Sequence, residues 1–290
     1  MSRAKETKLK SESASDHIIV KLTVLTYYKN IISKDETISP PIAAISALIE
    51  MVKSLKATTI SEFVLSVHEA INILITESGD SISIRAGCAV FIQILTKLAQ
   101  ADIMNLDELR RLLIESGDGM IEKANQCKET ISTLSSSFIR DNMVILLHSY
   151  SRVVMGCLKC AAKQNKRFSV YVTESRPDGS GLKTEKELKE LGIPCRIILD
   201  ASIGYYIAKV DLILLGAEGV VENGGLVNKI GTYQLAVLAK SAGKPLYALA
   251  ESYKFVRIFP LDQYDLFPKS NKYTDIDSRS SSQDLAEYLN

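Results

Sequence analysis

The sequence predicts an α/β protein in which an N-terminal bundle of helices precedes a domain built on a mainly parallel sheet. Two observations support this fold class. In the first half of the chain, apolar residues recur every three or four positions, which is the spacing of one face of an amphipathic helix. In the second half, short apolar runs alternate with helical stretches, which is typical of βαβ units with parallel strands.

This change of pattern divides the chain into three parts. Residues 1–17 are expected to be a flexible tail, because they are polar and contain no apolar core of the kind that a secretory signal has. Residues 18–137 are predicted to form the helical domain, and residues 138–290 the domain with the parallel sheet.

Start signals mark the helices of the first domain. Prolines at positions 40–41 precede an apolar series, where a helix entry tolerates the missing N–H. Thr59 with Glu62, and Asn105 with Glu108, have the spacing of capping boxes. The longest apolar stripe consists of Ile60, Phe63, Val64, Val67, Ile71 and Leu74.

The second domain contains five strand-like runs with helical stretches between them. The expected strands are Met143–Leu147, Phe168–Val172, Arg196–Leu199, Leu212–Leu215 and Leu246–Ala250. The expected helices lie near 152–164, 182–191, 202–208 and 232–242. A glycine and a proline in the turns at 192–194 and 243–245 end a helix just before a strand, as glycine after a helix and a following proline commonly do.

Charge and cysteine content argue against several classes of function. With 35 basic and 34 acidic residues, the chain has almost no net field, so direct capture of nucleic acid or of a membrane surface is not expected. No continuous apolar run reaches the roughly 18 residues of a membrane span. Five cysteines in apolar surroundings predict a reducing compartment, the cytosol.

No cofactor or metal is predicted. The chain has neither a G-x-G-x-x-G nor a P-loop lysine motif. Cys157 and Cys160 form a C-x-x-C, but there is no second pair and zinc needs four ligands, so packing in a helix is favoured over metal or redox chemistry.

Polar residues follow each predicted strand. The carboxyl ends of strands in a doubly wound sheet meet at one crevice, which is where such folds bind ligands. Arg176 and Lys229 would hold a phosphate there, and helix N-termini near Gly181 and Thr232 would add backbone donors. The residues expected to line this ligand pocket are Ser149, Arg176, Glu218, Asn228, Lys229 and Thr232.

The alternative for single residues is structural. Ser149 and Asp200 would then cap helices, and Glu218 and Glu222 would be solvated loop acids. A catalytic dyad of His148 with Ser149 is not expected, because neighbours on a strand point to opposite faces. We therefore predict no catalytic residue.

Four segments of the second domain carry a family resemblance. They are HSYSRVV (148–154), RFSVYVTESRPDGSG (167–181), GAEGVVENGGLVNKIGT (216–232) and ESYKFVRIFPL (251–261). In these the chain resembles the alpha-subunit family of eukaryotic translation initiation factor two-B. RAGC (85–88) and ISPPIAAISALIE (38–50) fit too, so the resemblance covers most of residues 18–268.

The resemblance implies a helical domain followed by a Rossmann-like domain, and a homodimer formed through the latter. It also implies a non-catalytic regulatory subunit of the cytosolic guanine-nucleotide exchange factor that reloads initiation factor two. Its partners would be the beta, gamma, delta and epsilon subunits, together with the phosphorylated alpha subunit of initiation factor two.

The same superfamily contains sugar-phosphate isomerases, which leaves a sugar-phosphate isomerase or sugar-phosphate-binding protein as the alternative. The resemblance places Ser149 where those enzymes carry a cysteine, and Glu218 where they carry an aspartate. The hydroxyl of Ser149 is a far weaker acid than the thiol of a cysteine. The side chain of Glu218 is one methylene longer than that of an aspartate, so its carboxylate is displaced from the position that catalysis needs. Arg176, Asn228 and Lys229 match substrate-site positions, so the binding half of the site is better kept than the catalytic half.

Two expectations concern the end of the chain. Tyr253, Phe255 and Phe259 lie in a segment rich in large apolar groups just beyond a strand, and we predict that they form the dimer interface. The family's chain continues with a segment that closes the Rossmann-like domain. After Pro268 this sequence has no further strand-like run, so that closure is expected to be missing or divergent.

Overall fold

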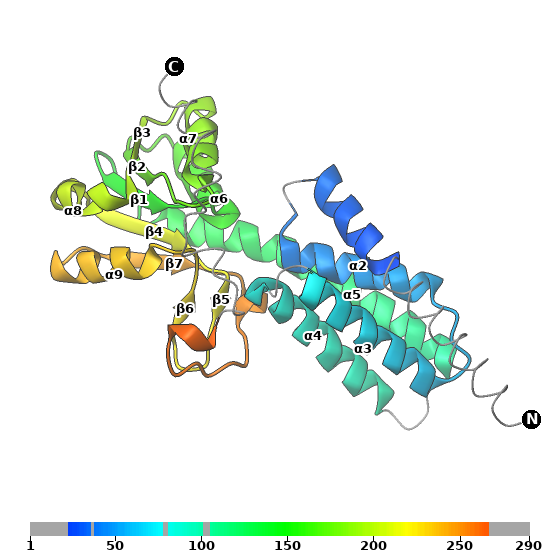
Figure 1. Cartoon of the computed structure of the whole chain (residues 1–290). Coiled ribbons are helices and arrows are strands. Elements are labelled where there is room, and N and C mark those ends of the chain that lie inside the picture. Colours follow the sequence, from blue (N-terminus) through cyan, green and yellow to red (C-terminus); the bar gives the residue numbers. More distant parts are fainter. Residues whose placement is uncertain (1–22, 36–37, 78–80, 101–104, 267–290) are drawn as a thin grey trace, which may run out of the picture. The chain divides into compact units, whose positions relative to one another are not determined.

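The computed structural model describes residues 23–35, 38–77, 81–100 and 105–266 (Figure 1). The described chain divides into two compact units. The first holds the residues up to Cys127 together with Glu251–Ile258, and the second holds Lys128–Ala250 and the chain from Phe259 onward. The division falls inside helix α5 (Leu106–Ser136), so one continuous helix contributes to both units. The predicted tail and C-terminal closure lie outside the described residues.

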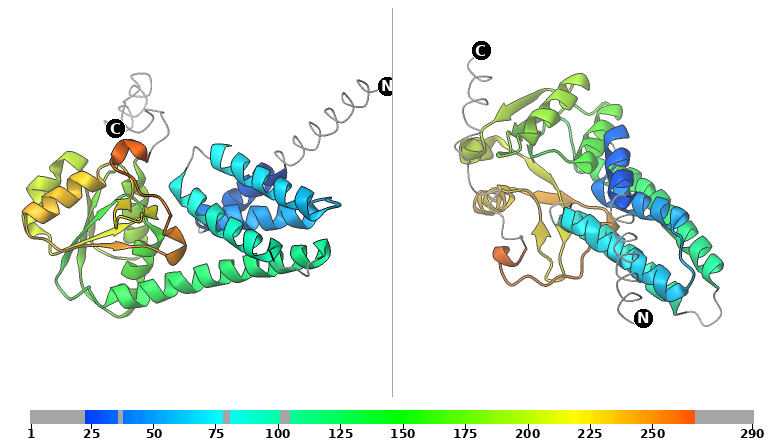
Figure 2. Two further views of the ribbon diagram at one scale, coloured as in Figure 1. Left: turned by 90° about the horizontal axis from the view of Figure 1, so that it is seen from below. Right: turned by 45° about the vertical axis from the view of Figure 1, so that its right-hand side comes forward.

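The first unit is a helical bundle, as predicted. Its helices are residues 23–34, α2 (Pro40–Ser54), α3 (Ile60–Glu77), α4 (Ile82–Ala99) and the first part of α5, and the bundle is visible in Figures 1 and 2. The predicted capping residues act at α3 and α5: Glu62 N–H donates to Thr59 Oγ1 (3.2 Å), and Glu108 N–H donates to Asn105 Oδ1 (2.8 Å). These caps satisfy N–H groups that have no partner within the helix.

Helix α4 is strongly apolar. Of the described helices it alone is long and apolar enough to cross a membrane by length and composition, with a mean hydropathy of 1.5 over 18 residues. Its buried residues Ile84, Cys88, Phe91 and Leu95 follow helical spacing and lie in the core of the bundle. Burial in this core accounts for the high hydropathy of the helix.

The segment Glu251–Ile258 returns to the helical unit after the last strand. Tyr253 is buried in the helical core, where its hydroxyl donates to Glu251 Oε1 (2.9 Å) and lies 3.2 Å from Ser39 Oγ. Burial and the adjacent Glu251 carboxylate raise the pKa of this hydroxyl, so it stays protonated and can donate. The hydrogen bonds fix the returning segment against the start of α2.

The second unit is a five-stranded parallel sheet in the order β3-β2-β1-β4-β7. Its strands are β1 (Val144–His148), β2 (Ser169–Thr173), β3 (Cys195–Ile198), β4 (Leu212–Gly216) and β7 (Leu246–Leu249). Each overlaps a predicted strand and differs from it by at most one residue at either end. The fold class, helices followed by a mainly parallel sheet, is therefore confirmed.

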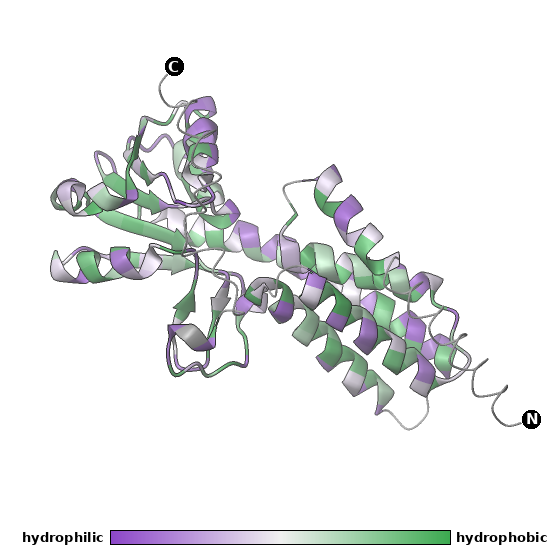
Figure 3. Ribbon diagram, viewed as in Figure 1, coloured by the Kyte–Doolittle hydropathy of each residue, from purple (hydrophilic) through white to green (hydrophobic). Residues whose placement is uncertain are grey.

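Helices cover both faces of this sheet. The helices are α6 (Arg152–Lys163), α7 (Ser180–Glu190), α8 (Ile203–Tyr206) and α9 (Thr232–Ser241). Ile145 and Leu147 of β1 pack with α6 and α7, whereas Leu146, between them, packs with α8 and α9. This alternation follows from the two-residue period of a strand. Both faces of β4 are covered in the same way, and the whole strand is apolar (Figure 3).

Two details differ from the prediction. The region expected as one helix at 202–208 is a short α8 flanked by 3-10 turns. A small antiparallel hairpin, β5 (Gly219–Val220) with β6 (Leu226–Val227), follows β4 and was not predicted. Strands of two residues are too short to produce a recognisable alternation in sequence.

The C-x-x-C cysteines lie in α6, as packing residues would. Burial raises the pKa of the Cys157 thiol, which disfavours the reactive thiolate. Within the described parts of the chain, no three histidine, cysteine or acidic side chains gather as a metal site would require.

The start of α7 depends on a glycine. A Cβ at Gly181 would lie 1.9 Å from the carbonyl oxygen of Thr173, at the end of β2. No side chain fits there without moving backbone, so this glycine brings the helix against the sheet.

We predict that Gly181→Ala lowers the free energy of unfolding of the Rossmann-like unit by about 2 kcal/mol or more, because the added methyl must displace backbone. Chemical denaturation followed by fluorescence or circular dichroism measures the change. Gly204→Ala is the matched control, since its Cβ would meet only Leu238 at 4.0 Å and should be neutral or slightly stabilising. Equal stability of the two variants would contradict the close approach.

Candidate functional site

The predicted site lies at the carboxyl edge of the parallel sheet. Strand β1 is central, with β2 and β3 on one side and β4 and β7 on the other. The chain therefore leaves β1 in one direction and later returns to its other side, which creates the switch point where such sheets bind ligands. Ser149 follows β1, Glu218 follows β4, and residues 228–232 lead from the hairpin into α9.

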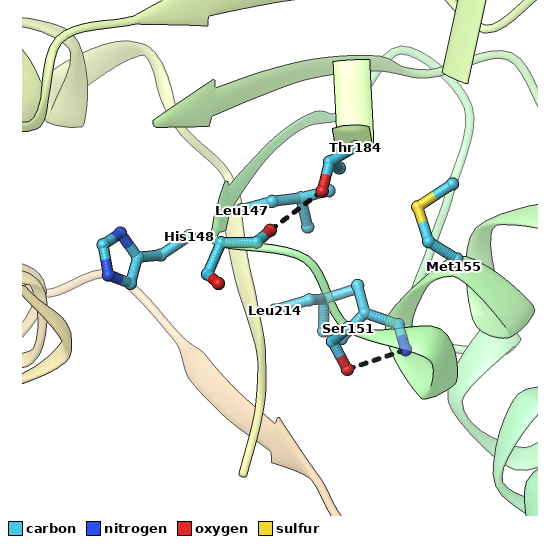
Figure 4. A pocket seen from close by; sticks show the side chains of 8 residues that line it. Leu147, His148, Ser151, Met155, Thr184 and Leu214 are labelled. Atoms are coloured by element: carbon cyan, nitrogen blue, oxygen red, sulfur yellow. Dashed lines mark hydrogen bonds between the residues drawn. The ribbon is translucent and has the colours of Figure 1, made fainter. Parts of the chain in front are cut away.

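Ser149 is buried and held by α7. Its backbone has a left-handed φ of 67° and its side chain is turned to Ser180, with the two Oγ atoms 2.8 Å apart. Its carbonyl accepts a hydrogen bond from Thr184 Oγ1 (3.0 Å), drawn in Figure 4. The expected alternative role as a helix cap is wrong, because Ser151 is the N-cap of α6.

His148 takes no part with Ser149, as predicted. Its Nε2 lies 2.7 Å from the carbonyl oxygen of Ile230, and its Nδ1 lies 2.6 Å from Thr173 Oγ1. A carbonyl oxygen only accepts, so Nε2–H donates to Ile230, and Nδ1 pairs with the threonine hydroxyl. Figure 4 shows the ring pointing away from Ser151 and Met155. Both ring nitrogens are therefore used to join β1 to β2 and to the segment before α9.

The position of the His148 ring explains why residue 231 is a glycine. Gly231, the N-cap of α9, has a φ of 94°, and a Cβ there would lie 2.7 Å from Cε1 of His148. Only glycine combines this backbone angle with this close approach.

Asp200 organises the loop after β2 and does not cap a helix through its side chain, so that expectation is wrong. Its two carboxylate oxygens accept the backbone N–H groups of Ser175 (2.9 Å) and Arg176 (2.7 Å). Oδ1 also lies 3.9 Å from His148 Nδ1. The Asp200 carboxylate, just after β3, therefore fixes the loop that carries Arg176.

Both cations predicted to hold a phosphate are paired with carboxylates. Arg176 Nε donates to Glu174 Oε2 (3.2 Å), two residues earlier. Lys229 forms an ion pair with Asp178, which lies in the loop after β2. Partial burial raises the pKa of the Asp178 carboxyl, but hydrogen bonds from Lys229 and Ser180 outweigh it and bring that pKa below its ordinary value.

The backbone donors expected at Gly181 are also occupied. Ser180 N–H donates to Asp178 Oδ1 (3.0 Å), and Gly181 N–H donates to the carbonyl of Glu174 (3.2 Å). At the start of α9, Asn228 Nδ2 donates to Thr232 Oγ1 (3.1 Å). The polar groups of this edge thus satisfy one another.

The β5–β6 hairpin positions Glu218 at the site. Its backbone N–H donates to the carbonyl of Val227 (2.8 Å), which places it across from the residue before Asn228. The Glu218 side chain is half-buried. Glu222, in the turn of the hairpin, is exposed, which agrees with the alternative that it is a solvated loop acid.

A continuous series of contacts joins four of the site's residues. The hydroxyl of Ser149 is hydrogen-bonded to that of Ser180, and the backbone N–H of Ser180 donates to Oδ1 of Asp178. The other carboxylate oxygen of Asp178, Oδ2, pairs with the Lys229 ammonium. We call Ser149, Ser180, Asp178 and Lys229 the edge cluster. Sequence reasoning named only the first and last of these, although the D-G step at 178–179 before a helix is a recognisable turn signal.

The pocket beside Ser149 is closed. It is bounded by Ser151, Val154, Met155 and Leu214, and it has no room for a water molecule (Figure 4). A ligand could enter this pocket only if the side chains around Ser149 moved.

The predicted interface residues fall in two places. Tyr253 is buried in the helical core and so does not lie on a surface. Phe255 and Phe259 are 62% and 63% exposed, which suits an interface, and their role there stays a prediction. Beyond them, Asn223 of the hairpin turn donates to the carbonyl of Pro260 (3.0 Å) and fixes that part of the segment.

Comparisons with known proteins agree with this fold and with the family resemblance. Residues 35–286 match the Initiation factor 2 subunit family. The chain is 42% identical over 244 residues to the translation initiation factor eIF2B subunit alpha of Dictyostelium discoideum (84% of this chain, 76% of that protein). It is 34% identical over 258 residues to the protein of that name from Caenorhabditis elegans (88% and 84%).

A ribose 1,5-bisphosphate isomerase of Methanocaldococcus jannaschii is 32% identical over 215 residues (73% of this chain, 66% of that protein). Among solved structures, the Pyrococcus horikoshii translation initiation factor eIF-2B has a TM-score of 0.68 at 24% identity (84% and 83% covered). A chain of the tetrameric eIF2B-beta2-delta2 complex from C. thermophilum has a TM-score of 0.70 at 20% identity (85% and 81%). These two likenesses show the fold.

The family match covers nearly all of the described chain, and the alpha-subunit relatives align across both units. The resemblance found in the sequence motifs is thereby confirmed. The chain belongs to the Initiation factor 2 subunit family.

Proposed function

We propose that this chain is a non-catalytic regulatory subunit of the guanine-nucleotide exchange factor for translation initiation factor two, acting in the cytosol. The observation that carries the proposal is the 42% identity to an eIF2B alpha subunit along 84% of this chain. The chain would act as a homodimer that holds the beta, gamma, delta and epsilon subunits in a larger complex. Its surface would receive the phosphorylated alpha subunit of initiation factor two and so restrain exchange.

The chemistry of the edge cluster supports a non-catalytic role. Ser149 has a hydroxyl where the isomerase resemblance expects a thiol, and that hydroxyl is bonded to Ser180. The adjacent imidazole is committed to Ile230 and Thr173. Activating a serine hydroxyl requires a neighbouring base, and His148 does not face it.

A second candidate function is binding of a sugar phosphate without conversion. It is favoured by the 32% identity to a ribose 1,5-bisphosphate isomerase and by the placement of Lys229, Asn228 and Thr232 at the carboxyl edge. Lysine and arginine bind phosphate through charge-assisted hydrogen bonds. Such a ligand would stabilise the protein and could report metabolic state to the exchange factor.

We predict that omitting this chain leaves basal nucleotide exchange by the other four subunits at least partly intact but weakens inhibition by phosphorylated initiation factor two. The reason is that the chain carries no nucleotide motif, so the exchange chemistry lies elsewhere. Release of labelled GDP measures both quantities. Full sensitivity of the remaining subunits, at matched concentration and assembly state, would refute the regulatory role.

We predict that Phe259→Asp raises the monomer fraction, because a charge replaces an exposed apolar side chain at the proposed interface. Analytical ultracentrifugation of the full chain measures the change. Leu65→Asp is the matched control: Leu65 is 69% exposed, lies on α3 of the helical unit and should leave the dimer intact. A folded, fully dimeric Phe259 variant would exclude this position from the interface.

We predict that ribose 1,5-bisphosphate raises the melting temperature of the wild-type chain, because a ligand that binds the folded state stabilises it by mass action. Lys229→Ala should abolish the shift while the variant stays folded. Lys240→Ala, an exposed lysine on α9, is the control and should keep it. A shift of equal size in all three proteins would place binding elsewhere.

A further inference from the structure

We propose that Asp178 keeps the anion site closed: its carboxylate holds the Lys229 ammonium until a phosphate group of the ligand displaces it. The inference rests on the sugar-phosphate binding proposed above and concerns the regulation of that same site. It makes Asp178 a residue that sets the affinity of the site.

The first support is the way the ion pair spans the site. Asp178 follows β2 and Lys229 follows the hairpin, so the pair joins loops that are 51 residues apart in sequence. The Arg176–Glu174 pair, in contrast, lies within one loop. The Asp178–Lys229 pair thus connects the loop after β2 directly to the segment before α9, on the two sides of the predicted ligand position.

The second support is that Asp178 uses the donors that a phosphate would use. Its Oδ2 accepts a hydrogen bond from the Lys229 ammonium, and its Oδ1 accepts one from the backbone N–H of Ser180. A phosphate oxygen binds the same kinds of group, an ammonium and a backbone N–H. The carboxylate thus stands where the anionic part of a ligand would be expected, so the two compete.

The third support is the difference between Asp178 and its acidic neighbours. Asp200 is tied by both oxygens to backbone N–H groups and so is fixed in place. Asp178 and Lys229 both have side chains that are 36% exposed, so solvent and ligands can reach the pair. Since its pKa is lowered, Asp178 is ionised at neutral pH, and the competition operates throughout the physiological range.

Displacement of the Asp178 carboxylate would also affect the surroundings of Ser149. Ser180 links the two, since its N–H bonds to Asp178 and its hydroxyl to Ser149. When the carboxylate leaves, the Ser180 N–H becomes available to the ligand. The pocket beside Ser149, which has no room for water in the closed state, then lies next to a loop released from its restraint.

Asp178→Asn tests the proposal. The amide keeps an oxygen for the Ser180 N–H but removes the charge that holds Lys229, so the fold should persist. Isothermal titration calorimetry with ribose 1,5-bisphosphate should give a Kd about fivefold lower than the wild type, as expected when a partly exposed ion pair no longer competes. Asp178→Ser, whose hydroxyl can also accept from Ser180, gives a second folded variant with the same expected direction.

Two controls separate the explanations. Glu190→Gln removes one negative charge at the far, exposed end of α7 and should leave the Kd unchanged. Adding Lys229→Ala to Asp178→Asn should remove the gain, because the released ammonium is what binds the phosphate.

Binding by the Asp178 variants alone, or tighter than by the wild type, supports the proposal. Wild-type binding that is equal to or tighter than that of both Asp178 variants overturns it while leaving the proposed binding in place. An equal gain in Glu190→Gln also overturns it, because the effect would then be one of net charge. Absence of binding in every protein refutes the sugar-phosphate function and this inference together.

Discussion

The buried imidazole of His148 is the interaction on which the arrangement of the site depends. It sits at the end of the central strand β1 and bonds to Thr173 of β2 and to the carbonyl of Ile230, just before α9. Each bond is made inside the protein, where an unsatisfied polar group costs about 1–3 kcal/mol. The close approach of Gly231 to the ring then fixes where α9 begins. Through one side chain, three segments that are distant in sequence share a single geometry.

Around this fixed point the polar groups of the edge satisfy one another. Asp200 holds the backbone before Pro177, Asp178 holds Lys229, and Ser180 holds Ser149. Such a network fixes the loops at this edge relative to one another. The same residues support the loops after β2 and before α9, so the fold requires them whether or not a ligand binds at this edge.

Much of this architecture could be predicted from the sequence. The core strands of a parallel sheet are buried on both faces, so their continuous apolar runs, such as Leu212–Leu215, are visible without a structure. Capping pairs such as Thr59 and Glu62 act over three residues and were equally accessible. The cations Arg176 and Lys229 could be named because phosphate binding by such groups is a local property of the side chain.

What could not be predicted depends on residues that are far apart in the chain. Tyr253 has the appearance of an interface aromatic until its partner Ser39, 214 positions away, is known. Asp178 has no feature in sequence that assigns it to Lys229, and a lysine expected to be available for phosphate is paired. The β5–β6 hairpin is different, because it pairs residues that are close in sequence, and it was missed because strands of two residues are too short to carry a periodic signal.

The most direct test of the central claim is co-expression of the full chain with the beta, gamma, delta and epsilon subunits. Purification through a tag on this chain, followed by native mass spectrometry, reports what it assembles with. A regulatory subunit predicts one complex that contains all five kinds of chain, with two copies of this one. Recovery of this chain alone, as a free monomer or dimer with none of the other four, would contradict the account.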